Sequence, residues 1–434
     1  MDIYNFISFC GMLALLLFAW CFSSDRKRMN WSLIFWGIVI QLAMALFIFI
    51  VPAGSKIFLF LNDIVIKILN SSTAGAHFLF GRLALGPGQV NASGETSLGF
   101  ILAFQAFPTI IFFSSLISIL YFLNIMPIII RGFAYVFTKL MKISGAESLS
   151  AASNIFVGIE SALTIKPHLK DMTASELCTV LTVGMATVAS NVLVLYVLFL
   201  QDQFPSIAAH LISASFLSAP AALVMSKILM PESEVPKTLG EHIKPYYERD
   251  NSLFEAIING ANSGVTMIVG ISALLIAVLG LVALIDLSFA YIGSKICMIF
   301  GAEIDFSLKN IFGYIFYPFT LVIGIPVADA GIISKIIGER VVLTEVVAYQ
   351  DLARVMGENV LSSPRSFVLA SYALCGFAHL PSMAIFVGGI SALAPSRTGV
   401  IASVALRALI AATLGCLMTA AVAGIFFTQG SLLI

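Results

Sequence analysis

Charged side chains are scarce in this chain: Asp, Glu, Lys and Arg together make up 11% of its 434 residues. Soluble domains carry about a quarter charged residues. With 59% hydrophobic residues and a mean hydropathy of +1.02, the chain lacks the polar surface needed to cover itself in water. The 23 basic residues balance the 23 acidic ones, so nothing points to a nucleic-acid partner. These shortages exclude a soluble globular protein and indicate an integral membrane protein.

Clustered cysteines and enzyme motifs are also missing. The six cysteines are scattered, and no CxxC or Cys/His cluster occurs, which predicts small buried side chains rather than disulfides or metal ligands. HExxH, GxSxG and a carboxylate cluster are absent, which argues against a membrane-embedded enzyme. No organic cofactor is predicted.

What the chain does have is long apolar stretches. Eight of them can cross roughly 30 Å of hydrocarbon as helices, and none shows the alternation of barrel strands. They cover residues 4–23, 32–52, 100–130, 175–200, 206–230, 262–286, 367–394 and 400–428. Segment 55–70 mixes Lys56, Asp63 and Lys67 with apolar residues at helical spacing, which predicts a helix lying in the membrane interface. The predicted fold class is therefore an all-α membrane protein.

Two segments, 145–170 and 330–363, are too interrupted by Gly, Pro and polar residues to span, and we interpret both as re-entrant hairpins. They carry Glu160 and Glu345, and an ionisable residue at membrane depth is a functional-site hypothesis by default. A helix with a polar break follows each hairpin, at 184–191 and 375–382. Because the hairpins enter from opposite sides, this order predicts an inverted-repeat transporter with its site at the midplane.

The same pattern predicts five regions and an orientation. The regions are N-terminal helices with the interfacial helix (1–99), a scaffold helix and amphipathic arm (100–142), a first repeat (143–230), a connector with a second scaffold helix (231–310) and a second repeat (311–434). Arg26, Lys27 and Arg28 follow the first apolar run and are expected in the cytoplasm, which leaves both termini outside.

Six pieces of the sequence resemble the concentrative nucleoside transporter family, in family order and spacing. They are NIFVG, E and IKP within 154–167, GMATVAS at 184–190, FGYIFYP at 312–318, GERVVLTEVVAY at 338–349, CGFAHLPS at 375–382 and SALAPSR at 391–397. The resemblance covers essentially the whole chain. It implies a homotrimer of eight-helix protomers in the inner membrane, each moving a nucleoside inward with sodium or protons.

The resemblance also implies a sodium site. The family forms it from a hairpin Asn side chain, a nearby Val carbonyl, a Ser hydroxyl on the next helix and the carbonyl that follows. The matching positions here are Asn154, Val157, Thr187 and Val188, and threonine keeps the hydroxyl that serine would supply. Oxygen ligands of this kind suit a small hard cation.

The implied substrate site departs from the family pattern. Its members are Gly158, Ile159, Glu160, Glu345, Val346, Phe377, His379 and Ser382. Glu345 matches the family's ribose-binding Glu, and Phe377 matches an aromatic residue beside the sugar. The hairpin Gln that reads the base is missing, because one residue fewer separates Gly158 from Glu160, and His379 replaces an Asn. A site that loses a hydrogen-bonding group changes its selectivity.

Three functions remain open at this point. The first is a cation-coupled nucleoside symporter, with sodium favoured over protons. The second is a transporter of the same fold for a different nucleoside-like solute, and the third, disfavoured by the missing motifs, is a membrane-embedded enzyme. His379 can replace Asn as a hydrogen-bonding partner or carry a proton, while His77, His168, His210 and His242 are expected to be solvated near interfaces or loops.

Overall fold

The computed structural model describes residues 2–90, 94–247, 249–300 and 306–428. Within them, regular structure is helical apart from two isolated bridges, at Val90–Thr96 and Ser144–Leu239. The α-helices are α1 (Ile3–Cys21), α2 (Trp31–Phe49), α3 (Pro52–Phe80), α4 (Leu102–Gln105), α5 (Phe107–Phe122), α6 (Ile125–Met141), α7 (Gly145–Asn154), α8 (Ser161–Thr164), α9 (Ala174–Ala186), α10 (Ser190–Leu200), α11 (Ile207–Leu229), α12 (Leu253–Phe300), α13 (Leu308–Val322), α14 (Val327–Val342), α15 (Glu345–Gly357), α16 (Pro364–Leu374), α17 (Leu380–Leu393) and α18 (Thr398–Phe426). Short 3-10 turns lie at Gly81–Ala84, Leu169–Asp171 and Pro395–Arg397.

Eight helical stretches of the described chain are long and apolar enough to cross a membrane. Seven coincide with expected spans, and the all-helical membrane fold is confirmed. The eighth is Pro52–Ala84, which contains the segment 55–70 expected in the interface, so that helix is longer than predicted and satisfies the length of a crossing. The expected span 367–394 is instead two short helices, α16 and α17, joined by a break.

The expected span 100–130 also ends early. Helix α5 stops at Phe122, and Asn124 takes a left-handed conformation with φ of 61°. Asparagine tolerates this region better than most residues. The chain therefore turns before α6, which forms the amphipathic arm expected up to residue 142.

Both predicted hairpins contain two helices separated by a break. In the first, α7 ends at Asn154 and α8 begins at Ser161; in the second, α14 ends at Val342 and α15 begins at Glu345. The helices that follow them are broken as well, α9 from α10 at residues 187–189 and α16 from α17 at 375–379. The order of hairpin and broken helix thus repeats in the two halves, as the sequence predicts.

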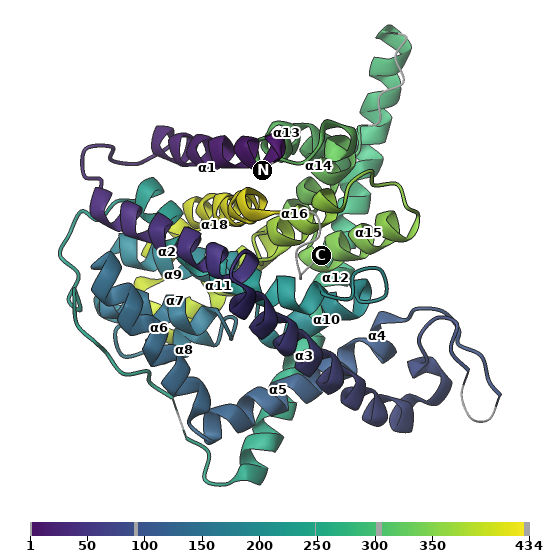
Figure 1. Ribbon diagram of the computed structural model, residues 1–434, viewed down its shortest axis with the longest axis horizontal. Helices are drawn as coiled ribbons and strands as arrows, with labels where there is room; N and C mark the ends of the chain where they lie inside the picture. The colour runs from purple at the N-terminus through teal and green to yellow at the C-terminus, as the bar shows by residue number, and fades with distance from the viewer. Residues whose placement is uncertain (1, 91–93, 248, 301–305, 429–434) are drawn as a thin grey trace.

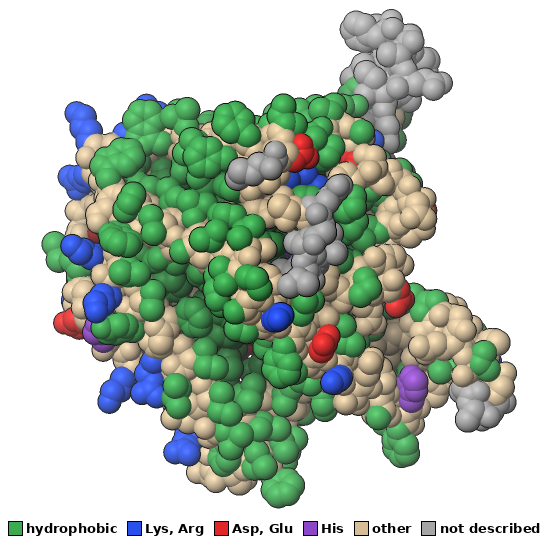
Figure 2. All heavy atoms as spheres, viewed as in Figure 1, with side chains coloured by type: hydrophobic (Ala, Val, Ile, Leu, Met, Phe, Trp, Pro, Cys, Tyr) green, Lys and Arg blue, Asp and Glu red, His purple; other side chains and the backbone are tan. Residues whose placement is uncertain are grey.

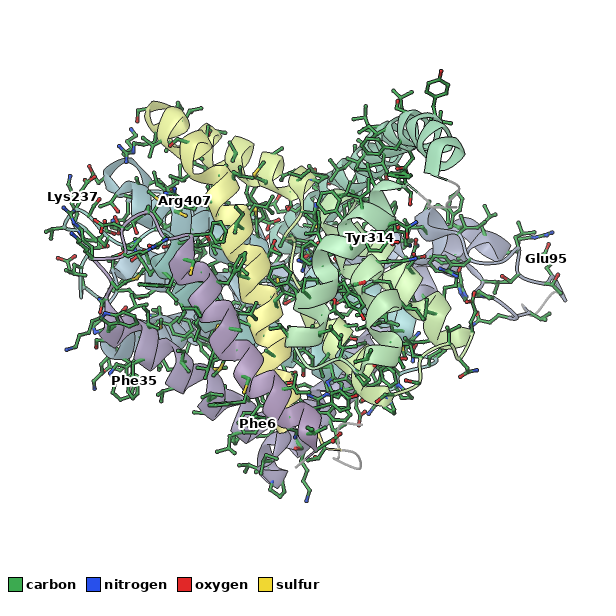
Figure 3. All side chains as sticks on the ribbon, turned by 90° about the horizontal axis from the view of Figure 1, so that it is seen from above. Phe6, Phe35, Glu95, Lys237, Tyr314 and Arg407 are labelled. Atoms are coloured by element: carbon green, nitrogen blue, oxygen red, sulfur yellow. The ribbon has the colours of Figure 1, made fainter. Side chains whose placement is uncertain are left out.

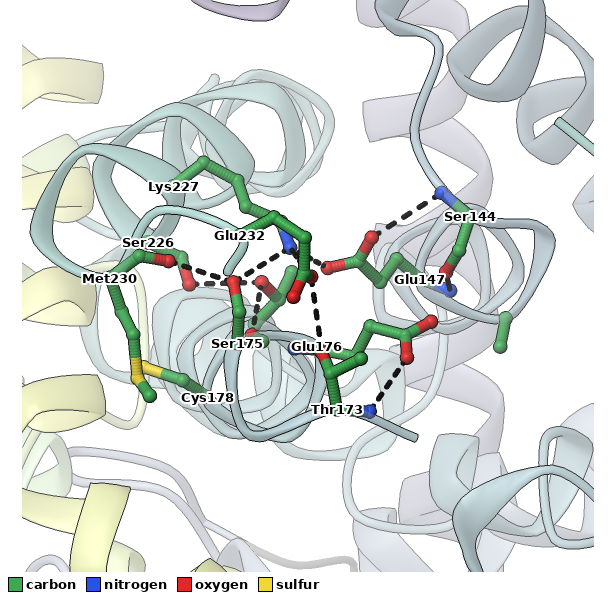
Figure 4. A network of polar contacts seen from close by, with 12 residues as sticks. Ser144, Glu147, Thr173, Ser175, Glu176, Cys178, Ser226, Lys227, Met230 and Glu232 are labelled. Atoms are coloured by element: carbon green, nitrogen blue, oxygen red, sulfur yellow. Dashed lines mark hydrogen bonds and ion pairs between the residues drawn. The ribbon is translucent and has the colours of Figure 1, made fainter. Parts of the chain in front are cut away.

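A buried ion cluster ties the base of the first hairpin to its neighbours (Figure 4). Glu147 and Glu176 close capping boxes at the N-termini of α7 and α9. Lys227 of α11 lies between the elements, with Nζ 2.5 Å from Glu147 Oε1 and 3.2 Å from Glu232 Oε2. Ser175 Oγ accepts a hydrogen bond of 2.9 Å from the same ammonium. One lysine therefore holds α7, α9 and α11 together at one end.

The core forms where α9, α11 and the second half of α18 meet. Almost every residue of α11 is buried, and α1 and α18 lie side by side against it (Figures 1 and 3). His210 of α11 corrects an expectation, because it is fully buried instead of solvated. Its Nδ1 lies 3.1 Å from the Tyr372 hydroxyl.

Helix α12 has the opposite environment. It crosses the molecule and projects beyond the other helices (Figure 1), and none of the residues in its most apolar window is buried. Hydrophobic side chains cover most of the face drawn in Figure 2, while Lys and Arg gather along one edge. Exposed apolar surface on this scale needs lipid or another protein against it.

Candidate functional site

The breaks of the two hairpins and of the two broken helices surround one cavity of about 130 Å³. All eight residues expected at the substrate site line it: Gly158, Ile159, Glu160, Glu345, Val346, Phe377, His379 and Ser382. The fourth wall is an apolar face of α12 formed by Met267, Ile271, Leu274 and Leu275. The cavity is therefore mostly apolar with a few convergent polar groups, as small-molecule sites are.

Glu345 is placed by the second hairpin. Thr344 caps α15 by accepting the N–H of Val347, so Glu345 stands at the first position of the helix, where the helix dipole favours a negative charge. The side chain is only 4% exposed. The Tyr196 hydroxyl of α10 donates to Glu345 Oε1 over 2.8 Å, while Oε2 faces His379.

His379 is placed by the break before α17. Its Nδ1 accepts the N–H of Ser382 over 3.1 Å as the N-cap of that helix, so Nδ1 carries no proton in this arrangement. The proton of the neutral ring then sits on Nε2, which lies 2.5 Å from Glu345 Oε2. Those two facing atoms have no other hydrogen-bond partner within the described residues. Oε2 keeps lone pairs for a ligand in the cavity, whereas the one N–H of the ring points at the carboxylate.

The tip of the first hairpin fits between the other breaks. A Cβ on Gly158 would lie 3.2 Å from Ala189 Cβ and 3.9 Å from the Phe377 ring. Ile159 packs on α17 at Gly389, where a Cβ would come within 2.4 Å of Ile159 Cδ1. The absence of a side chain at Gly389 thus makes room for Ile159, in a hairpin that lacks the family's Gln.

Glu160 borders a second, more polar cavity of about 360 Å³. This cavity shares Gly158 and Glu160 with the first and extends between α5, the first hairpin and the 231–252 connector. Its polar walls include Ser114, Asn191 and Asp250. A path for a polar solute therefore adjoins the first cavity on the side of Glu160.

The four expected cation ligands gather at the first hairpin and the break after α9. Asn154 is fully buried; its amide donates to the Ser150 carbonyl over 2.9 Å, and its Oδ1 has no partner among the described residues. The Thr187 hydroxyl donates to the Val183 carbonyl over 2.9 Å, which leaves its lone pairs free. Val157 and Val188 lie in the two breaks, outside regular helix.

An orphaned amide oxygen, a hydroxyl with free lone pairs and unwound backbone are the kinds of group that bind a hard cation such as Na⁺. The ends of these two segments are also joined directly, because the Ser190 N–H donates to the Phe156 carbonyl over 3.0 Å. No group of three His, Cys, Asp or Glu side chains in the described chain could hold a metal ion.

Sequence reasoning missed several contributors. Tyr196 is a single hydroxyl in an apolar run, and nothing in the run indicates that it reaches Glu345. Gly376 was also missed: its φ is +149°, and a Cβ there would lie 2.7 Å from the Ala186 carbonyl oxygen. The two helix breaks therefore touch through this glycine. The spacing of Met267, Ile271 and Leu274 predicts one helix face but not what that face covers.

Three family models match the chain. One described as "Na+ dependent nucleoside transporter C-terminus" matches residues 210–424, and its N-terminal counterpart matches residues 10–83. A third, described as "Nucleoside recognition", matches residues 103–203.

Similar proteins include a nucleoside permease, NupC, of Helicobacter pylori, which is 37% identical over 426 residues covering 97% of this chain and 98% of the permease. Solute carrier family 28 member 3 of Mus musculus is 37% identical over 435 residues. That match covers 97% of this chain but 59% of the carrier.

Solved structures similar to the chain include CNTnw in an inward-facing substrate-bound state. The TM-score is 0.88 at 33% identity, with 100% of both chains covered. A doubly substituted CNTnw in an outward-facing state gives 0.86 at 32% identity, with 98% of both chains covered.

Proposed function

Because the chain belongs to the concentrative nucleoside transporter family, we propose that it carries nucleosides into the cell together with sodium, by alternating access. The family membership agrees with the missing enzyme motifs, and the alternative of a membrane-embedded enzyme is dropped. The single observation that carries the proposal is the cavity in which both hairpins and both helix breaks meet around Glu345 and His379.

Glu345 is the proposed partner of the sugar hydroxyls. A carboxylate accepts two hydroxyl hydrogen bonds at once, and charge-assisted bonds are the strong ones. Tyr196 already occupies Oε1 with a hydrogen bond of 2.8 Å and fixes the rotamer. An arriving ribose then bonds to the remaining lone pairs and takes the place of part of the contact with His379.

Base recognition differs from that of Gln-bearing relatives in this proposal. Ile159 makes the hairpin side of the cavity apolar, and it is seated against Gly389. A polar base edge that loses its hydrogen-bond partner costs about 1–3 kcal/mol of binding free energy, which lowers the affinity roughly tenfold or more. His379 on the opposite wall offers a flat ring for stacking or one hydrogen bond. We infer that the preferred substrate has a different base preference, and a modified nucleoside would also fit.

Sodium is the proposed coupling ion, held by Asn154, Val157, Thr187 and Val188. The unpartnered Asn154 Oδ1 supports this assignment, because a buried acceptor without a partner is costly unless a cation fills the place. Bound sodium would tie the first hairpin to α9 and raise nucleoside affinity, a reciprocal coupling of about 1–3 kcal/mol. Proton coupling through His379 and Glu345 is the second candidate, supported by the close approach of Nε2 to Oε2.

The assembly and placement in the cell follow the same reasoning. We infer a homotrimer in the inner membrane, since the apolar α12 is unburied in the protomer. Both termini are placed outside, with Arg26, Lys27 and Arg28 in the cytoplasm. Figure 3 places Lys237 and Glu95 at opposite ends of the molecule.

Calorimetry on the purified protein tests both the nucleoside site and the sodium coupling. Binding of uridine, cytidine, adenosine, inosine and guanosine is measured in sodium and in choline. We expect saturable binding that is about tenfold or more tighter in sodium, and an order of affinity unlike that of Gln-bearing relatives. Absence of binding for all five would contradict the nucleoside site. An affinity order equal to that of Gln-bearing relatives would mean that backbone groups or water read the base.

A further inference from the structure

Arg340 is a buried charge that the nucleoside and sodium sites do not use. It lies near the end of α14 in the second hairpin and is fully buried. Its Nη1 donates to the Ala373 carbonyl over 2.6 Å, and the Cys416 thiol lies nearby. Among the described residues, Nε and Nη2 have no hydrogen-bond partner and no carboxylate forms an ion pair with the guanidinium. An unpaired charge in a membrane protein's interior is expensive and rarely kept without a function.

The guanidinium faces the end of a broken helix. Ala373 is in the last turn of α16, where carbonyls have no partner within the helix and the helix dipole is negative. The break that follows contains Gly376, which packs directly on the Ala186 carbonyl at the end of α9. The negative end of α16 therefore contacts Arg340 directly, and the end of α9 packs on the same break through Gly376, so a cation suits this place.

The first half offers the complementary arrangement. Asn154 ends α7 six residues before Glu160, and Arg340 lies near the end of α14 five residues before Glu345. The first hairpin, whose break is joined to the start of α10 by the Ser190 N–H and the Phe156 carbonyl, presents Asn154 Oδ1, an oxygen without a partner among the described residues. Beside the break after α16, the second hairpin presents a cation with donors to spare. The first hairpin therefore has no positive charge of its own at this position. The second hairpin has one, the guanidinium of Arg340.

We propose that the Arg340 guanidinium is a resident cation, standing in the second half where the first half takes up its coupling ion. It holds the break between α16 and α17, and with it Phe377 and His379, in the geometry that receives the nucleoside. The conformation of the break between α16 and α17 is then independent of the sodium concentration. Only the first half needs a sodium ion, so one sodium ion accompanies each nucleoside. This inference rests on the proposed sodium-coupled nucleoside transport.

The variants Arg340→Gln and Arg340→Lys test it through two binding measurements. Nucleoside affinity is measured at saturating sodium, and sodium binding without nucleoside is followed by the sodium-dependent rise in melting temperature. Arg340→Gln should weaken nucleoside binding about tenfold or more, because the helix ends lose their charge. Its sodium response without nucleoside should be unchanged. Arg340→Lys should restore affinity to within about threefold, because a point charge suffices for a single hydrogen bond.

Arg365 provides a matched control. It is also buried, at 2% exposed, but its guanidinium is satisfied by Gly324, Asn5, Ser8, Tyr4 and Gly424. Arg365→Gln should lower the melting temperature while the folded protein keeps its nucleoside affinity. A structural role alone would make the two arginine substitutions behave alike.

The inference is overturned if Arg340→Gln elutes and melts like the native protein and binds nucleoside within threefold of it. Should that variant not fold, the ratio of sodium to nucleoside taken up by the native protein in vesicles decides, with one expected and two contradicting. Failure of the proposed function itself looks different, because the native protein would then bind no nucleoside or ignore sodium.

Discussion

His379 and Glu345 are held against each other at the meeting point of the two halves, with Nε2 of the ring 2.5 Å from Oε2 of the carboxylate. The partners come from different elements, the break before α17 and the start of α15. The ring's other nitrogen is committed to the Ser382 N–H. The pair therefore offers a substrate a carboxylate with lone pairs to spare, and the ring's N–H becomes a donor only when a substrate displaces it from that carboxylate.

Replacing Glu345 with Gln is expected to weaken uptake of every nucleoside alike. The amide loses the charge-assisted bonds to the sugar, a loss of about 1.5–3 kcal/mol or roughly tenfold to hundredfold in affinity. Initial uptake rates across the five nucleosides measure it. Glu358, which is exposed and paired with Arg354, gives the control substitution Glu358→Gln, with no change expected. A shift in base preference with rates intact would assign Glu345 to the base instead.

Substituting His379 with Asn should preserve transport but move base preference toward that of Asn-bearing relatives. Asparagine is a favoured N-cap, so the bond to the Ser382 N–H survives, whereas the flat ring is lost. His379→Ala removes both and should lower affinity for every substrate. Competition against labelled uridine reports the preference. An unchanged order of competitors in His379→Asn would remove the ring from base recognition.

The substitution Asn154→Ala is expected to raise the sodium concentration needed for half-maximal uptake by about tenfold or more, because one ligand of a hard cation is deleted. The control is Ser150→Ala, since Asn154 keeps its bond to the Ser150 carbonyl without that hydroxyl. Sodium titrations at fixed nucleoside give the values. Equal half-saturation in Asn154→Ala and the native protein would place the ion elsewhere.

Lys227 should govern stability rather than recognition. Lys227→Met leaves the buried Glu147 without its counter-charge, at a cost of about 3–5 kcal/mol in the free energy of unfolding. The double change Lys227→Met with Glu147→Gln should recover part of the lost melting temperature. Lys237→Met serves as control, because Lys237 and its partner Asp171 are exposed. A native melting temperature for Lys227→Met would show that the cluster stabilises nothing.

Much of the fold and site could be predicted because the signals are local. Seven of the expected apolar spans, the helix–break–helix order of both hairpin segments and the family resemblance are confirmed, and the motifs around Glu160 and Glu345 identified the residues that the structure brings around one cavity. Whether those residues bind substrate stays a prediction. Tyr196, the seat of Ile159 at Gly389 and the unpartnered Arg340 could not be predicted, since each depends on a contact between distant segments. The burial of His210 was mispredicted for the same reason.

Uptake of labelled nucleoside into vesicles containing the purified protein tests the central claim most directly. Uptake is compared in vesicles of the same internal volume under three conditions: an inward sodium gradient, an inward proton gradient and no gradient. The account predicts concentrative uptake with the sodium gradient alone, strongly weakened by Glu345→Gln. Uptake that ignores sodium and follows the proton gradient would contradict sodium coupling, and no uptake under any gradient would contradict nucleoside transport.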